Sequence, residues 1–335
     1  MFRKASLAGM SVLFSVIQCN FAQGQSLTQT TLTIDLQNVV EYQGDIADPS
    51  RFATNPNVTP SSAPRNFYVA TLIGDIVAVN GQPAKGTYVG RSRSVILSPT
   101  PTGAANSEAI SDVTRGALRE HIFEILKNDG TPIGSIVSLG FSGGPAPPGM
   151  PSTERGNWAI VGGTGAFLGA RGQVGGTGGA ARAASMAEDP ANRRINGGAA
   201  FSFIVHVIPM FAPQIATTGA GPAVAHSSDF TLVTSSKPAA AGEALSIFAT
   251  GLGPTVPEVD LGLPFPSNPG AAVNSPVTVT VNGKPAEVLG GVGFPGAVDG
   301  YQVNFRVPPD TVKGVATVQV SAAWIAGPPV SIAVQ

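Results

Sequence analysis

The sequence has little charge and almost no cysteine. Only 12% of its 335 residues are charged, about half the share in an ordinary soluble protein. A disordered chain combines high charge with low apolar content, so this composition excludes one. The formal net charge is −1 and no run of basic residues occurs, so the electrostatic surface that nucleic-acid binding requires is lacking.

The sequence is rich in turn formers and apolar residues. It contains 42 glycines and 29 prolines, and 43% of its residues are hydrophobic. Coiled coils and helical bundles require Ala, Glu, Lys and Leu with few turn formers, so they are excluded. The composition favours an all-β protein, and the length suits two domains.

Residues 1–24 have the pattern of a secretory signal peptide. Arg3 and Lys4 form a positive start, residues 7–17 are mostly apolar or small, and Ala22-Gln-Gly24 matches a small-x-small cleavage site. The apolar stretch is shorter than the 20 or so residues of a membrane-spanning helix. We therefore expect a secreted protein, with the periplasm and the cell surface as alternatives. A lipoprotein signal with Cys19 as the lipidated residue is the competing interpretation.

The chain that follows residue 24 has no cysteine, with 17 basic and 20 acidic residues. Disulfides and cysteine-based metal or redox chemistry are therefore excluded for it. Its histidines, His121, His206 and His226, lack the close spacing of metal ligands, so we expect no metal and no cofactor. It also has no segment expected to serve as a transmembrane anchor.

Residues 27–208 contain strand-like runs of alternating or β-branched residues. The run 118–126 is ambiguous, because Leu118, Ile122 and Leu126 also have helical spacing. It ends in Asn128-Asp-Gly130, a strong hairpin signal, so we interpret it as a strand that turns back into 133–141. The remaining runs are 31–36, 67–73, 86–97, 157–161 and 199–208. About eight evenly spaced strands predict a closed barrel.

Residues 209–228 are rich in Gly, Ala and Pro and are predicted to be a linker. The block 229–335 contains seven short strand-like runs separated by turns such as Asn282-Gly283, which is typical of an immunoglobulin-like sandwich. Its predicted strands are 229–235, 244–250, 277–282, 287–289, 301–307, 316–321 and 330–334.

Two motifs suggest catalysis but lack the required context. Gly140-Phe-Ser142-Gly-Gly144 matches the G-x-S-x-G pattern of serine hydrolases, yet a Pro/Gly-rich loop follows where a helix is needed. The glycine-rich segment 161–172 superficially matches a dinucleotide-binding loop, but the residues after it have no helical apolar spacing. We therefore expect neither a hydrolase nor a nucleotide-binding protein.

The segment Asn157-Trp-Ala-Ile-Val-Gly-Gly-Thr-Gly-Ala-Phe-Leu-Gly-Ala-Arg-Gly172 resembles the signature of the allene oxide cyclase and dirigent superfamily. Gly86–Ser92 and Gly74-Asp75 resemble earlier strands of the same family, so the resemblance covers about residues 65–206. It implies an eight-stranded antiparallel barrel with a mostly apolar cavity, in which an epoxide is cyclised or phenolic radicals are oriented without a cofactor. Ala166 is neutral, and no catalytic set of the family can be matched.

Five polar residues in or beside the predicted barrel strands are candidates for ligand binding: Asp75, Tyr88, Arg91, Glu120 and Arg171. In a small barrel, alternate residues of each strand point inward. Both faces of these strands carry apolar residues, so the sequence leaves open which candidates face the interior. Arg171 has two interpretations: it braces the glycine-rich corner by hydrogen bonds to carbonyl groups, or it faces the cavity.

The C-terminal block carries a second resemblance. Ala244–Pro254, Pro276–Ala286, Gly300–Pro308 and Ser331–Gln335 resemble, in this order, an uncharacterised domain common at the end of large secreted acidobacterial proteins. The resemblance implies an immunoglobulin-like module of an exported bacterial protein, with a role in sorting, adhesion or presentation, and implies no reaction.

We therefore expect a secreted bacterial protein of two all-β domains whose barrel binds a small apolar molecule. A cofactor-free cyclase, isomerase or stereochemical guide is one alternative. A structural envelope or matrix protein with a filled barrel is another. The expected partners are a small apolar ligand and a cell-surface or matrix component, without nucleic acid.

Cleavage after Gly24 is directly testable. N-terminal sequencing of the exported protein should begin at Gln25, and a sequence that starts before residue 20 would contradict the prediction. The lipoprotein alternative instead predicts a modified Cys19, and Cys19→Ser would then abolish membrane association.

Overall fold

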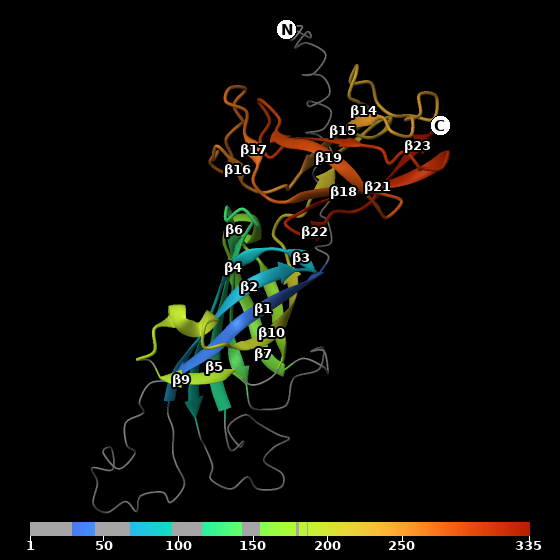
Figure 1. Ribbon diagram of the computed structural model, residues 1–335. Coiled ribbons are helices and arrows are strands. Elements are labelled where there is room, and N and C mark those ends of the chain that lie inside the picture. Colours follow the sequence, from blue (N-terminus) through green and yellow to red (C-terminus); the bar gives the residue numbers. More distant parts are fainter. Residues whose placement is uncertain (1–28, 44–67, 96–115, 143–154, 179–180, 186) are drawn as a thin grey trace, which may run out of the picture. The chain divides into compact units, whose positions relative to one another are not determined.

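The computed structural model describes residues 29–43, 68–95, 116–142, 155–178, 181–185 and 187–335 (Figure 1). The predicted signal peptide lies outside these residues. The described chain forms two compact all-β units, Gln29–Met210 and Phe211–Gln335. No helix among the described residues is long and apolar enough to span a membrane.

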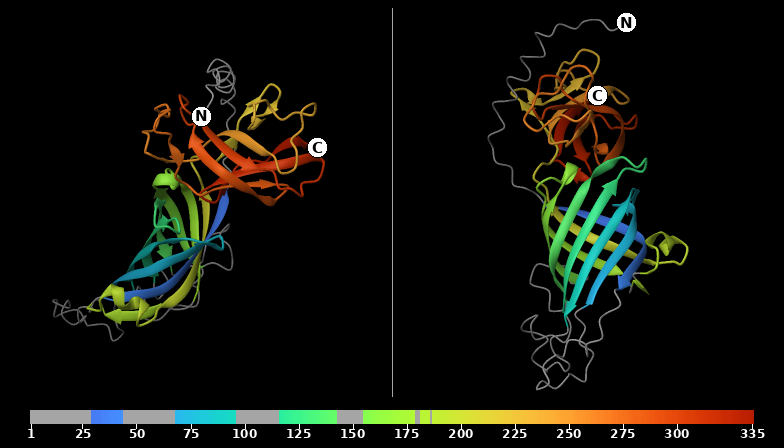
Figure 2. Two further views of the ribbon diagram at one scale, coloured as in Figure 1. Left: turned by 45° about the horizontal axis from the view of Figure 1, so that its top comes forward. Right: turned by 90° about the vertical axis from the view of Figure 1, so that its left-hand side faces the viewer.

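The first unit is a closed antiparallel barrel of eight strands. The right view of Figure 2 shows strands of one wall side by side, with further strands crossing behind them. The strands are β1 (Thr30–Gln43), β2 (Tyr68–Val79), β4 (Lys85–Val95), β5 (Gly116–Leu126), β6 (Pro132–Ser142), β7 (Arg155–Gly163), β8 (Arg171–Gly178) and β10 (Ala199–Ile208). They pair in chain order, and β1 closes the barrel by pairing with both β2 and β10. The predicted barrel is therefore confirmed.

The side chains of these strands alternate between the barrel interior and the outer face. Along β10, Phe203, Val205 and Val207 are buried in the interior, while the residues between them face outward. The ambiguous run 118–126 lies within β5, and the turn Lys127–Thr131 returns the chain into β6, as predicted. β8 has the sequence RGQVGGTG and too few apolar residues to be recognised as a strand by itself.

Four smaller elements accompany the barrel: β3 (Gln82–Pro83), β9 (Arg182–Ser185) and the 3₁₀ turns η3 (Gly165–Phe167) and η4 (Pro190–Arg194). The predicted glycine-rich corner holds η3, which joins β7 to its antiparallel neighbour β8. β9 pairs in parallel with the end of β1, beyond the β1–β10 ladder. The corner therefore has the geometry of a β-hairpin and lacks the strand–helix–strand unit of a nucleotide-binding loop.

The second unit is an antiparallel sheet that is nearly closed. Its strands are β11 (Gln214–Ile215), β14 (Val224–His226), β15 (Ala244–Thr250), β16 (Thr255–Val256), β17 (Ala272–Val273), β18 (Val277–Val281), β19 (Lys284–Gly293), β20 (Tyr301–Arg306), β21 (Gly314–Ala322), β22 (Ile325–Ala326) and β23 (Val330–Val334), with the separate hairpin β12 (Thr217–Thr218) and β13 (Gly221–Pro222). The main path runs β11-β15-β20-β19-β18-β21-β22. Its two ends come close, because a side chain at Gly327, just after β22, would collide with the Pro213 carbonyl before β11.

The strands predicted from the sequence of this unit match the observed strands best where the apolar pattern is regular. β15 and β23 have the predicted bounds, and Asn282-Gly283 forms the predicted turn between β18 and β19. The predicted strand 229–235 is wrong: this segment is mostly irregular, with a single bridge from Leu232 to Ala225. The predicted linker 209–228 contains β11 and β14, and both pair with β15.

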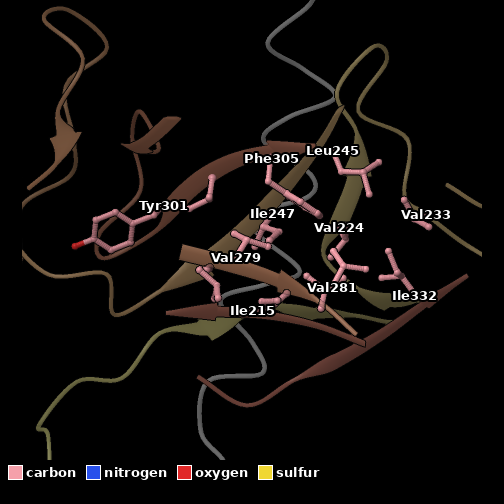
Figure 3. Close-up of a cluster of buried hydrophobic side chains, with 14 of the residues drawn as sticks. Ile215, Val224, Val233, Leu245, Ile247, Val279, Val281, Tyr301, Phe305 and Ile332 are labelled. Atoms are coloured by element: carbon pink, nitrogen blue, oxygen red, sulfur yellow. The ribbon is translucent and has the colours of Figure 1, made fainter. Parts of the chain in front are cut away.

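The core of the second unit is formed by side chains from most of its strands, of which Figure 3 shows a part. Leu245, Ile247, Val303 and Phe305, on β15 and β20, are fully buried. Val224 of β14 is also fully buried, and Ile215 of β11 is 2% exposed. Residues before position 229 therefore belong to this core.

We predict that a fragment Phe211–Gln335 unfolds cooperatively and is more stable than a fragment starting at Ser228. The shorter fragment loses the burial of Ile215 and Val224, and each buried aliphatic side chain is worth about 1.5–3 kcal/mol. Urea unfolding followed by circular dichroism measures the difference. Equal stability of the two fragments would show that β11 and β14 are dispensable.

Candidate functional site

The barrel places the five candidate residues on different faces. Tyr88 is buried in the interior, whereas Arg91, three positions further along β4, is exposed on the outer face. Glu120 is the register partner of Arg91 and shares the outer face. The structure therefore does not bring the five candidates together into one site.

Asp75 lies on the outer face, where it holds the segment that contains η4. Its carboxylate accepts hydrogen bonds from Arg193, from Arg194 at 2.7 and 2.9 Å, and from the Asn38 side chain at 2.9 Å. Burial by itself would raise the pKa of Asp75, but hydrogen bonds from Arg194, Asn38 and Arg193 outweigh it and lower the pKa to about 2. This arrangement fastens one segment to the barrel wall.

Arg171 is exposed at the start of β8 and reaches back over the glycine-rich corner. Its Nη1 donates to the carbonyl oxygens of Ala170 at 2.9 Å, Val161 at 3.3 Å and Gly169 at 3.4 Å. These contacts match the bracing interpretation. The side chain does not face the barrel interior.

The interior contains a polar and aromatic group that we call the interior polar cluster. It consists of Ser92, Arg119, His121, Ser138 and Trp158. Ser92, Arg119, Gly140 and Trp158 follow one another in register across β4, β5, β6 and β7, and His121 pairs with Ser138 in the adjacent inward row. Each of the four residues in the first row lies two or three positions from the end of its strand, at the same end of the barrel.

Ring contacts hold the cluster against the apolar interior. The His121 ring lies 4.4 Å from that of Trp158, edge to face, and 5.3 Å from that of Phe203. The Arg119 guanidinium lies 6.0 Å from the centre of the Trp158 ring, within the range of a cation–π contact. Gly140 stands between Arg119 and Trp158 in the register and has no side chain to separate them.

Tyr88 joins the cluster through a buried hydrogen bond of 2.7 Å between its hydroxyl and His121 Nδ1. Gly90 makes this contact possible, since a Cβ at this position would lie 2.5 Å from the Tyr88 hydroxyl oxygen and 3.0 Å from Cζ. Tyr88 also packs on Phe123 and Phe203, with ring centres 5.4 and 5.1 Å apart. The alternation of glycine and tyrosine along β4 is therefore a packing requirement.

Burial keeps both partners of this hydrogen bond uncharged. Burial, reinforced by the positive charge of Arg119, lowers the pKa of His121 to about 3. Burial also raises the pKa of Tyr88 far above its ordinary value; Arg119 opposes this shift, and the negative charge of Glu41 adds to it. Glu41 lies on the inner face, because its register partner is the buried Leu72.

Several buried polar atoms of the cluster have no hydrogen-bond partner within the described part of the chain. They are Ser92 Oγ, Arg119 Nε, His121 Nε2, Ser138 Oγ and Trp158 Nε1. Ser92, His121 and Ser138 are at most 1% exposed, and Trp158 is 4% exposed. Arg119 Nε and Trp158 Nε1 are donors, His121 Nε2 is a donor when Tyr88 donates to Nδ1, and the serine hydroxyls can donate or accept.

Sequence reasoning identified Tyr88 and missed the other members of this cluster. The available signal was the period of two along β5, which places Arg119 and His121 on the same face as Phe123. Leu118 and Ile122 make the opposite face equally apolar, so the pattern does not show which face is inside. No group of three His, Cys, Asp or Glu residues suited to a metal ion occurs among the described residues.

No family model matches this chain, and comparisons with curated proteins and with solved structures found no match either. The closed barrel is therefore established by its own geometry.

We predict that Gly90→Ala destabilises the barrel by about 1–3 kcal/mol, the usual cost of overpacking a core, because its Cβ collides with Tyr88. Adding Tyr88→Phe should recover part of the loss, since the nearest atom is then removed. Gly162→Ala is the control, because its Cβ would have no neighbour within 4 Å. Thermal and urea unfolding measure the effect; equal stability of Gly90→Ala and Gly162→Ala would contradict the packing argument.

Asp75 gives a prediction for pH. Its pKa in the folded protein, about 2, is below the ordinary value of 3.8, so its contribution to stability is present above pH 3.8 and is lost as the pH falls towards 2. Asp75→Asn should therefore cost about 2 kcal/mol at pH 7 and progressively less below pH 4. Urea unfolding at several pH values tests this, with Glu124→Gln as an exposed control on the same surface; a difference independent of pH would refute it.

Proposed function

We propose that this chain is an exported bacterial protein whose barrel binds a small, mainly apolar molecule through the interior polar cluster. The observation that supports this function is the concentration of buried polar atoms without partners in one region of a mainly apolar interior. Such atoms normally have partners in folded proteins. A bound molecule that accepts their hydrogen bonds accounts for them.

The number of these atoms makes their total cost in folding free energy large. Each buried polar group without a partner costs about 1–3 kcal/mol, and a domain is stable by only about 5–15 kcal/mol. Five such atoms together approach the whole stability of the barrel. A ligand that restores their hydrogen bonds would stabilise the folded state through its own binding free energy.

The size of the barrel limits the ligand. An interior formed by eight strands is either filled by side chains or holds one small ligand. At the opposite end the buried side chains are large ones, Ile125, Ile133 and Phe167. The small side chains of Ser92 and Ser138, together with Gly140, favour the cluster end as the place for a small molecule.

Binding is favoured over the alternative of a cofactor-free cyclase or isomerase. A general acid or base is most effective when its pKa is near the working pH. The pKa of His121 is far below neutrality and that of Tyr88 far above it, so both are suited to donating fixed hydrogen bonds. The resemblance of Asn157–Gly172 to the allene oxide cyclase and dirigent signature supports the binding region, and we do not extend it to the reaction.

The C-terminal unit is proposed to be an immunoglobulin-like module for sorting, adhesion or presentation. This proposal rests on the resemblance of four ordered segments to the domain of secreted acidobacterial proteins, and on the antiparallel strands of the unit. The pattern of residues 1–24 supports export.

Native mass spectrometry of the full chain, purified from its own source, tests the proposed function. The protein should carry a small molecule that Arg119→Met loses and Arg91→Met retains, because Arg91 is an outward-facing arginine on the adjacent strand. Melting temperatures of both variants show whether they fold. Absence of any added mass on the unmodified protein would support the remaining alternative, a structural protein with a filled barrel.

A further inference from the structure

We infer that the ligand of the barrel is a small aromatic carboxylate, held with its carboxylate group at Arg119, Trp158 and His121. This inference rests on the proposed function and specifies the chemical class of its ligand.

The nitrogen atoms of the cluster that lack partners within the described part of the chain are hydrogen-bond donors. Arg119 Nε and Trp158 Nε1 can only donate, and each is buried without an acceptor among the described residues. His121 is neutral, so when Nδ1 accepts from Tyr88 its Nε2 is a third donor. These three donors belong to neighbouring inward residues, so a ligand with at least two acceptor positions suits them, and the two oxygens of a carboxylate provide these positions.

The positive charge of Arg119 also favours an anionic ligand. A guanidinium group is a cation, and no ion pair links Arg119 to a carboxylate in the described part of the protein. The guanidinium lies over the face of Trp158, which attracts a cation but does not neutralise it. Glu41 also faces the interior; it has interactions of its own and raises the pKa of Tyr88.

Aromatic side chains surround these donors. Trp158, His121 and Phe203 form mutual ring contacts between 4.4 and 6.4 Å beside the donors. Aromatic rings favour edge-to-face and offset contacts with another ring. A carboxylate attached to a planar ring therefore satisfies the donors and packs on these side chains, and a single ring suits the limited interior.

The test uses the indole N–H signals of the full chain in nitrogen-15 NMR spectra. The protein has two tryptophans, so Trp324→Phe, in the second unit, leaves Trp158 as the only indole. Benzoate should shift the Trp158 N–H signal in a saturable manner and bind at least tenfold more tightly than benzyl alcohol or benzylamine. Arg119→Met should remove this preference, and the outward Arg91→Met should keep it.

Equal affinity for benzoate and benzyl alcohol, or tighter binding of benzylamine, would overturn the carboxylate assignment and leave the proposed binding function standing. A response to acetate as strong as that to benzoate would overturn the aromatic part. No shift with any probe would also overturn the inference, and native mass spectrometry of the source protein then decides independently whether the barrel binds a small molecule at all. Retained preference for benzoate in folded Arg119→Met would remove Arg119 from the site.

Discussion

The limited interior of an eight-stranded barrel is the constraint on which the structure depends. Large rings fit inside only where a neighbouring inward position is nearly empty, and Gly90 fulfils this condition for Tyr88. The same relation holds between Gly176 and Phe203, since a Cβ at Gly176 would lie 3.2 Å from the phenylalanine ring. The high glycine content of the strands is therefore a consequence of the aromatic interior, and the Tyr88–His121 hydrogen bond follows from it.

This packing separates two kinds of polar group. Outside, Asp75 with Arg193 and Arg194 forms ion pairs that hold a peripheral segment, and Arg171 binds carbonyl groups at a corner. Inside, Tyr88 and His121 share a hydrogen bond, while Ser92 Oγ, Arg119 Nε, His121 Nε2, Ser138 Oγ and Trp158 Nε1 lack partners within the described part of the chain. The outer contacts serve the fold, and the interior atoms without partners are the basis of the binding that we propose.

The sequence was sufficient to predict the barrel, the β5–β6 hairpin at Asn128-Asp-Gly130 and the strands β15, β20 and β23. In these elements the apolar alternation and the turn residues indicate the same structure. It was insufficient for β8, in which glycines replace the apolar pattern, and for β11 and β14, which are too short to produce one. The site was hidden for a different reason. Leu118 and Ile122 make the outer face of β5 as apolar as the inner one, so only the closure of the barrel reveals that Arg119 and His121 point inward.

Closure through β1 has a consequence for how the chain acquires its structure. β1 pairs with β2 on one side and with β10 on the other, so Thr31 meets His206 across the whole length of the barrel sequence. Contacts between residues so distant in the chain are slow to form, since a large loss of chain entropy precedes them. One edge of β1 therefore stays unpaired until β10, the last strand of the barrel, has been synthesised. The topology of the barrel therefore links completion of the fold to synthesis of its last strand.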